Sequence, residues 1–456
     1  MKPPSHKPAL RQRKNTHVRH VFKMTAGSHP ITNPASELVI LWPWAFFFIA
    51  PFFSPNIFQA PTAVGVMAFT TALFSAAWMH ESTDLPPTRL HASEWLFLLL
   101  CLIPVTTLLV QGDINSPWQA WKQTLYLTAA WLIYAMSFSH ANRLLYSPQW
   151  ATLIALFAHL YVIYALLQAF DLRFFMPDKN ALFLIWSSQT QNFPGPLMQR
   201  NMQSLFLVIS ISFLWLQMTK QRSQKMWPIA TILPICGLLL TASRSGMLVL
   251  AIAAIGVLLF SKNKRHDVVS MLWPAILAWL IYTWVMMFPI AATSGADIIE
   301  RIETSGVLPR ILVWDMSLHI FLTHPWFGVG WGNLPAHGMD GIAMALAANP
   351  FLASTASTLS VAHIWAHNIV LQFLSEGGIF GGAAIFIILA ALLKQTWKWL
   401  SYREYPDDGQ IHGWLMSILI LAHGMVSISL MQPFFMSLLA LALAACFSPM
   451  PKGTER

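Results

Sequence analysis

Apolar runs long enough to cross a bilayer recur along the chain, and they constrain the fold more than any other feature. A helix crosses the hydrocarbon core of a membrane with about 20 residues. Hydrophobic residues make up 56% of the chain and charged residues only 10%, which excludes an ordinary soluble domain. The predicted spans are 38–54, 62–79, 93–111, 119–137, 150–170, 203–218, 227–241, 245–260, 270–291, 366–393, 411–427 and 430–447. The sequence therefore predicts an all-α polytopic membrane protein with about 12 transmembrane helices.

The distribution of Lys and Arg predicts the orientation of these spans. Residues 1–37 are basic, with no acid before Glu37 and no clear cleavage site after it, so we expect an uncleaved anchor behind a basic tail. With this tail in the cytoplasm, most of the 27 Lys and Arg fall in cytoplasmic segments, as the positive-inside rule requires. The C-terminal tail 448–456 is then cytoplasmic as well. We expect a multi-pass protein of a bacterial inner membrane, surrounded by membrane lipids.

In this topology two long hydrophilic segments face the periplasm. Loop 171–202 lies within the first nine membrane helices, which together span 38–291, and the large loop 292–365 precedes the last three helices, 366–447. Both loops are too long to be simple connections.

The large periplasmic loop is expected to be partly helical. Pro309 can open a helix that Pro325 ends. Between them apolar residues recur at helical spacing: Ile311, Trp314, Leu318 and Phe321. An amphipathic helix of this kind is expected to lie along the membrane surface.

The cations left on the periplasmic side need a separate explanation. They are Lys122, Arg173, Lys179, Arg200, Arg244, Arg301 and Arg310. Each is expected to pair with an acid, to sit in bulk water or to receive an anionic ligand. Arg301 can pair with Glu300 and Glu303. Arg244, in a tight turn, can snorkel to lipid headgroups, but its forked guanidinium also suits a bidentate grip on phosphate, as does that of Arg200.

The net charge and the cysteines exclude two other classes of protein. The charge of +9 does not indicate a nucleic-acid partner, because the basic residues are scattered between apolar runs. Cys101, Cys236 and Cys446 lie in apolar stretches, where they are expected to act as packing residues. The outer loop is therefore predicted to have no disulfide.

Two elements flank the point where the large loop re-enters the membrane. Gly330 and Gly332 allow close backbone approach, either in a tight anchored loop or in a turn that faces a ligand. His367 and Asn368 follow at the outer edge of the next span. A histidine there can simply bond the backbone, but its ordinary pKa also suits a general base. We interpret Glu376, further along the same predicted helix, as a buried hydrogen-bonded strut.

The histidines of the loop also raise the question of a metal. His363 and His367 have the spacing of a helical metal pair, and His319 and His324 lie in the same loop. No HExxH motif, cysteine ligand or acidic cluster accompanies them. We expect neither a metal nor another cofactor.

Three segments together resemble a known family. They are SRSG at 243–246, PWFGVGWGN at 325–333 and HNIVLQFLSEGGIFGG at 367–382. Their order and positions resemble those of the O-antigen ligase and polymerase superfamily, over roughly residues 195–385. That superfamily includes lipid A-core ligases, O-antigen polymerases and bacterial protein O-oligosaccharyltransferases. Residues 199–201 also resemble the Gln-x-Asn element of the pilin-type enzymes, although Met202 stands where those enzymes usually have His.

The resemblance implies transfer of a preassembled glycan from undecaprenyl diphosphate to an acceptor hydroxyl at the periplasmic face. Arg244, Arg310 and Arg200 would then bind the diphosphate, and His367 would remove the proton of the hydroxyl. The supporting residues would be Gln199, Asn201, Ser243, Asn368, Glu376, Gly330 and Gly332. A pilin-like protein Ser or Thr is the favoured acceptor, with lipid A-core or a growing O-antigen polymer as alternatives.

A transporter or flippase is the alternative from another class, because it would account for the predicted spans equally well. It predicts polar residues or helix breaks near the middle of several spans. In this sequence the ionisable residues instead cluster at the outer boundary of the membrane.

Overall fold

The computed structural model describes residues 41, 44–45, 47–49, 51, 117–138, 141–169, 196–197, 199–221, 226–286, 307–356, 365–401 and 406–448. Every regular element in this part of the chain is a helix, and none is a strand. The all-helical class is thus confirmed. The predicted spans 62–79 and 93–111, and most of 38–54, lie outside the described residues.

Each span predicted from residue 119 onward coincides with one helix. These helices are α4 (Pro117–Ser137), α6 (Pro148–Ala169), α7 (Arg200–Lys220), α8 (Met226–Leu240), α9 (Arg244–Phe260), α10 (Lys264–Met286), α15 (Ile369–Ser401), α16 (Asp408–Gly424) and α17 (Pro433–Phe447). A short helix, α5 (Ala141–Tyr146), links α4 to α6, and a 3-10 turn, η5 (Ser429–Met431), links α16 to α17.

Among the described helices, 4 are long and apolar enough to cross a membrane, namely α6, α7, α10 and α15. The helices α8, α9 and α17 are apolar but shorter. Apolar side chains cover the outside of α10, where Trp279 and Trp284 are exposed, as expected for a surface that meets lipid. The architecture is that of a helical multi-pass membrane protein, and the total of twelve spans stays a prediction.

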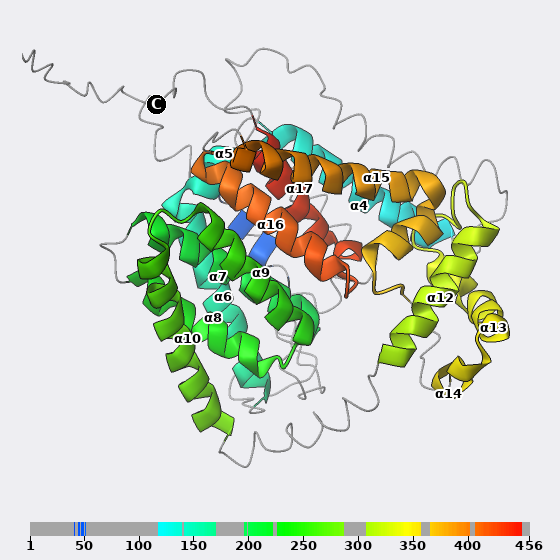
Figure 1. Ribbon diagram of the computed structural model, residues 1–456, viewed down its shortest axis with the longest axis horizontal. Helices are drawn as coiled ribbons and strands as arrows, with labels where there is room; N and C mark the ends of the chain where they lie inside the picture. The colour runs from blue at the N-terminus through cyan, green and yellow to red at the C-terminus, as the bar shows by residue number, and fades with distance from the viewer. Residues whose placement is uncertain are drawn as a thin grey trace, which may run out of the picture.

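Helix α7 lies at the centre of the bundle (Figure 1), and every residue from Met202 to Met218 is buried. It packs against α6, α8, α9 and α16. Aromatic rings fill the space on one side of it, with Phe206 4.7 Å from Tyr161 and 5.8 Å from Phe434 between ring centroids. A helix enclosed in this way holds the residues at its two ends in fixed positions.

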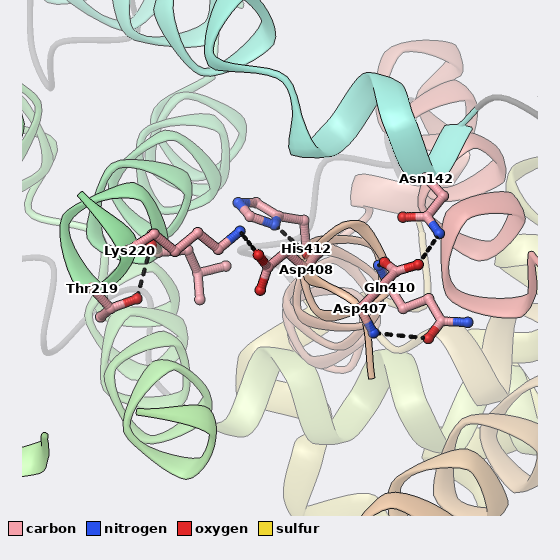
Figure 2. Close-up of polar contacts among 8 residues, drawn as sticks. Asn142, Thr219, Lys220, Asp407, Asp408, Gln410 and His412 are labelled. Carbon is pink, nitrogen blue, oxygen red and sulfur yellow. Dashed lines mark hydrogen bonds and ion pairs between the residues drawn. The ribbon is translucent and has the colours of Figure 1, made fainter. Parts of the chain in front are cut away.

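Helices α7 and α16 run in opposite directions, so α7 ends where α16 begins. At this point Lys220 Nζ lies 3.5 Å from Asp408 Oδ2, and both side chains point toward each other in Figure 2. Asp407 caps α16 through the Gln410 backbone N–H at 3.0 Å and accepts a hydrogen bond from the Asn142 side chain. We call this the Lys220 end of the bundle.

The ends of two further helices meet at the Lys220 end. Phe260, the last residue of α9, lies 5.8 Å from Trp399 in the last turns of α15 and 5.3 Å from Trp414 near the start of α16, measured between ring centroids. The opposite end, where α7 and α9 begin and α16 finishes, we call the Arg200 end.

Residues 307–356 form a separate helical unit beside the start of α15, at the right of Figure 1. It consists of α12 (Val307–Thr323), η2 (Leu334–His337), α13 (Gly338–Ala348), η3 (Pro350–Leu352) and α14 (Ala353–Ala356). Helix α12 packs against both α13 and α15. The unit has its own hydrophobic core, which includes Met316, Ile320, Leu334 and Ile342. Within the predicted large loop, residues 307–356 therefore form a small folded body.

Helix α12 confirms the helix predicted between Pro309 and Pro325. Its buried apolar residues are Leu312, Val313, Met316 and Ile320. The apolar residues predicted to face the membrane surface lie beside this buried face, and Leu318 among them is exposed. Helix α12 thus carries apolar residues on two sides, and α13 covers one of them. Its position along the membrane surface stays a prediction.

Helix α15 also differs from the expected single helix from 366. It begins at Ile369, and Gly378 interrupts it with φ 61° and ψ −152°. His367 precedes the helix and has a left-handed backbone, with φ 49°. The prediction that His367 and Glu376 share one continuous helix is therefore wrong.

Candidate functional site

The Arg200 end is built around the hydroxyl group of Ser243, the N-cap residue of α9. Ser243 Oγ donates to the side-chain oxygen of Asn201 at 2.9 Å, and it accepts from the backbone N–H of Gly246 at 3.2 Å. Ser204 Oγ also donates to Ser243 Oγ, at 3.0 Å. Because Asn201 lies in the first turn of α7, these bonds tie the start of α9 to the start of α7. Arg200 and Arg244, the first residues of the two helices, are thereby held near each other.

Helix α16 completes this network through a histidine that the sequence analysis did not single out. His423 is fully buried, and its Nε2 lies 3.2 Å from Ser245 Oγ. Ser245 Oγ in turn lies 3.0 Å from Ser243 Oγ. Hydrogen-bonded side chains therefore connect the starts of α7 and α9, which carry the arginines, to α16. The sequence signal that could have found His423 is the presence of an ionisable residue inside the predicted span 411–427.

The two helix starts favour a negatively charged ligand. Backbone N–H groups in the first turn of a helix have no helical acceptor, and the helix dipole adds partial positive charge there. Ser243 satisfies one such N–H of α9, and Arg244 is exposed. Gln199, the N-cap residue of α7, is partly buried and its side chain makes no capping hydrogen bond. This end of the bundle is suited to a phosphate group.

Arg310, in the first turn of α12, comes close enough to interact with both Arg244 and His367. Partial burial and the Arg244 guanidinium lower the pKa of Arg310. The Arg310 charge also acts on the imidazole of His367. Thus the structure brings together three of the predicted site residues from α9, α12 and the start of α15. They are separated by more than 50 residues of sequence at each step.

His367 is partly buried at the mouth of α15. Asn368 caps this helix, since its side-chain oxygen accepts from the backbone N–H groups of Val370 at 3.0 Å and Leu371 at 3.2 Å. Burial, together with the nearby Arg310 guanidinium, lowers the pKa of His367 to about 4. The imidazole is therefore neutral near pH 7 and can accept a proton.

The glycine turn packs against the break in α15. Val329 N–H donates to the Ser375 carbonyl and Gly330 N–H donates to the Glu376 carbonyl, each at 2.9 Å. Gly328 has φ 64°, and a Cβ there would lie 2.4 Å from the backbone carbon of Glu376. Gly330 and Gly332 also have positive φ, at 89° and 76°. This turn serves close backbone packing, as the glycines predicted.

Glu376 is fully buried beneath this turn, and its Oε1 accepts from the backbone N–H of Leu334 at 3.2 Å. It therefore joins α15 to the start of η2. This position agrees with our interpretation of Glu376 as a strut.

The described residues contain no group of three or more His, Cys, Asp or Glu that could hold a metal ion. His319 instead accompanies Asp315 in α12, with 2.9 Å between its Nδ1 and the Asp315 carbonyl oxygen. His363 lies outside the described residues. The helical pairing of His363 with His367 is wrong, because His367 precedes α15 and has a left-handed backbone.

Comparison with known proteins supports the resemblance read from the sequence. Residues 229–386 match the family model described as O-Antigen ligase. The matched stretch is about a third of the chain and includes Arg244, Arg310 and His367, whereas Arg200 precedes it. No curated protein matches the chain. The match supports a glycosyl-transferring membrane protein of the O-antigen ligase superfamily, for which a lipid-linked glycan donor and an acceptor are implied.

Proposed function

We propose that this protein transfers a preassembled glycan from undecaprenyl diphosphate to an acceptor hydroxyl. The observation that carries the proposal is the convergence of Arg310, Arg244 and His367 at the Arg200 end. Arg244 lies close enough to Arg310 to lower its pKa, so two cations lie close together there. A bound diphosphate would relieve this repulsion.

The proposed reaction uses these groups in one displacement. As the bond between the anomeric carbon and the diphosphate oxygen breaks, negative charge develops on the diphosphate, and the guanidinium groups stabilise it. The acceptor oxygen bonds to the anomeric carbon and gives its proton to the neutral imidazole of His367. Such a displacement inverts the anomeric centre. Neither a nucleotide sugar nor a metal takes part in this scheme.

In this proposal the residues at the start of α7 support the site and do not take the proton of the acceptor. They are Gln199, Arg200 and Asn201. Arg200 adds a third cation at the start of α7, while Asn201 and Ser243 fix the start of α9. Asn368 orders the first turn of α15, and Glu376, Gly330 and Gly332 secure the loop above it.

We further propose that the Arg200 end faces the periplasm. Lys220 and the start of α16 lie at the other end, where the contacts of Phe260 also place the segment that leads into Lys264. The basic connections thus gather on one side, as expected for the cytoplasmic face of a bacterial inner membrane. Alkaline phosphatase fused at Gly341 should be active and at Lys264 inactive, and the reverse pattern would overturn this orientation.

Among acceptors we favour a Ser or Thr of a pilin-like protein, because residues 199–201 resemble the Gln-x-Asn element of the pilin-type O-oligosaccharyltransferases. Lipid A-core and a growing O-antigen polymer are the alternatives within the family. Deletion of the gene distinguishes them. Loss of pilin glycosylation would indicate a protein acceptor, and loss of the O-antigen from lipid A-core would indicate lipid A-core. O-antigen chains of a single repeat would indicate a growing polymer as acceptor. No change in any surface glycan would contradict the proposal.

A transporter or flippase predicts helix breaks near the membrane centre. The break in α15 at Gly378 lies in the first third of that helix, and it is bonded to the glycine turn of the loop unit. This arrangement favours a site at the membrane boundary over a pathway through the bundle.

A further inference from the structure

A small pocket lies beside His367, between the first turns of α15 and the turn that joins α16 to α17. It has a volume of about 10 Å³, room for about one water-sized group, and is partly open to the outside. Its lining includes His367, Asn368, Gln372, Ser427, Leu430 and Met431. The guanidinium groups of the site do not line it, so the pocket is distinct from the place proposed for the diphosphate.

Two of the lining side chains are buried polar groups with unused hydrogen-bonding capacity. Gln372 is 2% exposed, and its Oε1 accepts from the backbone N–H of Ala366 at 2.9 Å. This bond fixes the carboxamide, while its Nε2 has no hydrogen-bond partner. Ser427 is also 2% exposed, and its hydroxyl has no partner either. Buried polar groups are normally satisfied, so this unsatisfied pair beside a water-sized pocket marks a place where a hydroxyl group could complete them.

The chemistry of the lining defines this ligand. Gln372 offers a donor, Ser427 offers a donor and an acceptor, and the neutral His367 imidazole offers an acceptor. Leu430 and Met431 supply apolar surface, and none of the described lining residues is a carboxylate. An uncharged carbon group that bears a hydroxyl satisfies all these features, whereas a phosphate does not.

We infer that this pocket binds the hydroxyl-bearing group of the acceptor, and this inference rests on the proposed function. The pocket has room for about one hydroxyl group, so the reacting hydroxyl enters it while the rest of the acceptor stays outside. A hydroxyl held there lies beside the base that must take its proton. The acceptor oxygen then bonds to the anomeric carbon, the proton passes to His367, and the electrons of the broken C–O bond leave with the diphosphate. Gln372 and Ser427 are thus acceptor-specificity residues.

Ser427→Ala tests the inference, with Ser429→Ala as its matched control. Ser429 lies in the same turn and is also buried with an unsatisfied hydroxyl, but it does not line the pocket. Because the Ser427 hydroxyl bonds nothing in the protein, its removal should leave the melting temperature unchanged. We expect Ser427→Ala to raise the KM for the acceptor about tenfold, the value of one hydrogen bond, without changing the KM for the donor.

The assay uses purified protein, undecaprenyl-diphosphate-linked oligosaccharide as donor, and either a serine-containing pilin peptide or lipid A-core as acceptor. Gln372→Glu keeps the acceptor for Ala366 N–H and removes the free donor, so it should also raise the acceptor KM. An altered donor KM with an unchanged acceptor KM would assign the pocket to the donor sugar and overturn the inference. Equal kinetics of wild type, Ser427→Ala and Ser429→Ala would overturn it too. If the wild type transferred to neither acceptor, the proposed function itself would fail, and the pocket's role with it.

Discussion

The two ends of the α7–α16 pair treat charge in opposite ways. At the Lys220 end a cation meets an anion, Lys220 with Asp408 at 3.5 Å, and Asp407 is occupied in capping α16 (Figure 2). At the Arg200 end, the Arg244 guanidinium lies close enough to lower the pKa of Arg310, and Arg310 in turn acts on the neutral imidazole of His367. The first arrangement pairs opposite charges, whereas the second brings two cations together and would gain stability from an added anion. Substitutions at the two ends should therefore have different consequences.

The largest effect is expected from His367→Ala. Loss of a general base typically lowers the rate by about 10²–10⁴-fold, while membrane insertion and donor binding should stay near normal. In vitro transfer from purified donor measures the rate. His363→Ala should remain near the wild-type rate in the presence of chelator, and equal loss in both variants would instead point to a metal pair.

Substitution of the arginines should have the next largest effect. Arg310→Ala should lower kcat by about 10²-fold, because the developing charge on the diphosphate loses a donor. The variants Arg310→Lys and Arg244→Lys should each transfer the glycan about tenfold more slowly than the wild type, since an ammonium cannot reproduce a bidentate contact. The matched control is Arg265→Ala at the start of α10, next to the Lys220 end, which should transfer normally. Full activity of the lysine variants would reduce these arginines to headgroup anchors.

The effect of pH on the rate should be smaller than the effects of these substitutions. It should also differ between the free protein and the donor-bound protein. Since the pKa of His367 is lowered to about 4, the imidazole is unprotonated above that value. We therefore expect kcat/KM to be flat from pH 5 to 8 and to fall below pH 5. A bound diphosphate offsets the charge of Arg310, so the pKa governing kcat should lie higher. A profile of kcat/KM that falls already between pH 8 and 6 would contradict this environment of His367.

The smallest effect is expected at the Lys220 end. Lys220→Met breaks an ion pair in which the Asp408 side chain is 43% exposed, so the loss of unfolding free energy should be within about 1 kcal/mol. Transfer activity per folded molecule should not change. Thermal unfolding in detergent measures the first quantity, and a large loss of activity in this variant would show that the two ends are coupled.

Much of the bundle could be predicted from the sequence, because hydropathy acts locally along the chain. The positive-inside rule selected Arg244 and Arg310 as cations on the predicted periplasmic side. The residues that sequence reasoning missed act through distant contacts. His423 lies in α16 and contacts the start of α9, and Ser427 follows α16 and lies beside the start of α15. Only the packing of α16 brings them there.

The loop unit shows a second limit. Spacing identified α12, but not which of its two apolar sides would be buried, because α13 decides that and its own sequence carried no strong signal. The sequence pattern predicts one continuous helix over 366–393, although Gly377 and Gly378 permit a break. That the break receives the N–H groups of Val329 and Gly330 follows only from the tertiary structure.

The central claim, that the Arg200 end transfers a lipid-linked glycan with His367 as base, is tested most directly by reconstituted transfer. Purified wild type, His367→Gln and Lys220→Met would be compared with undecaprenyl-diphosphate-linked oligosaccharide and an acceptor, with chelator present. We expect wild type and Lys220→Met to form the product with an inverted anomeric centre at similar rates, and His367→Gln to form almost none. Transfer by His367→Gln near the wild-type rate, or a product with retained configuration, would contradict the account.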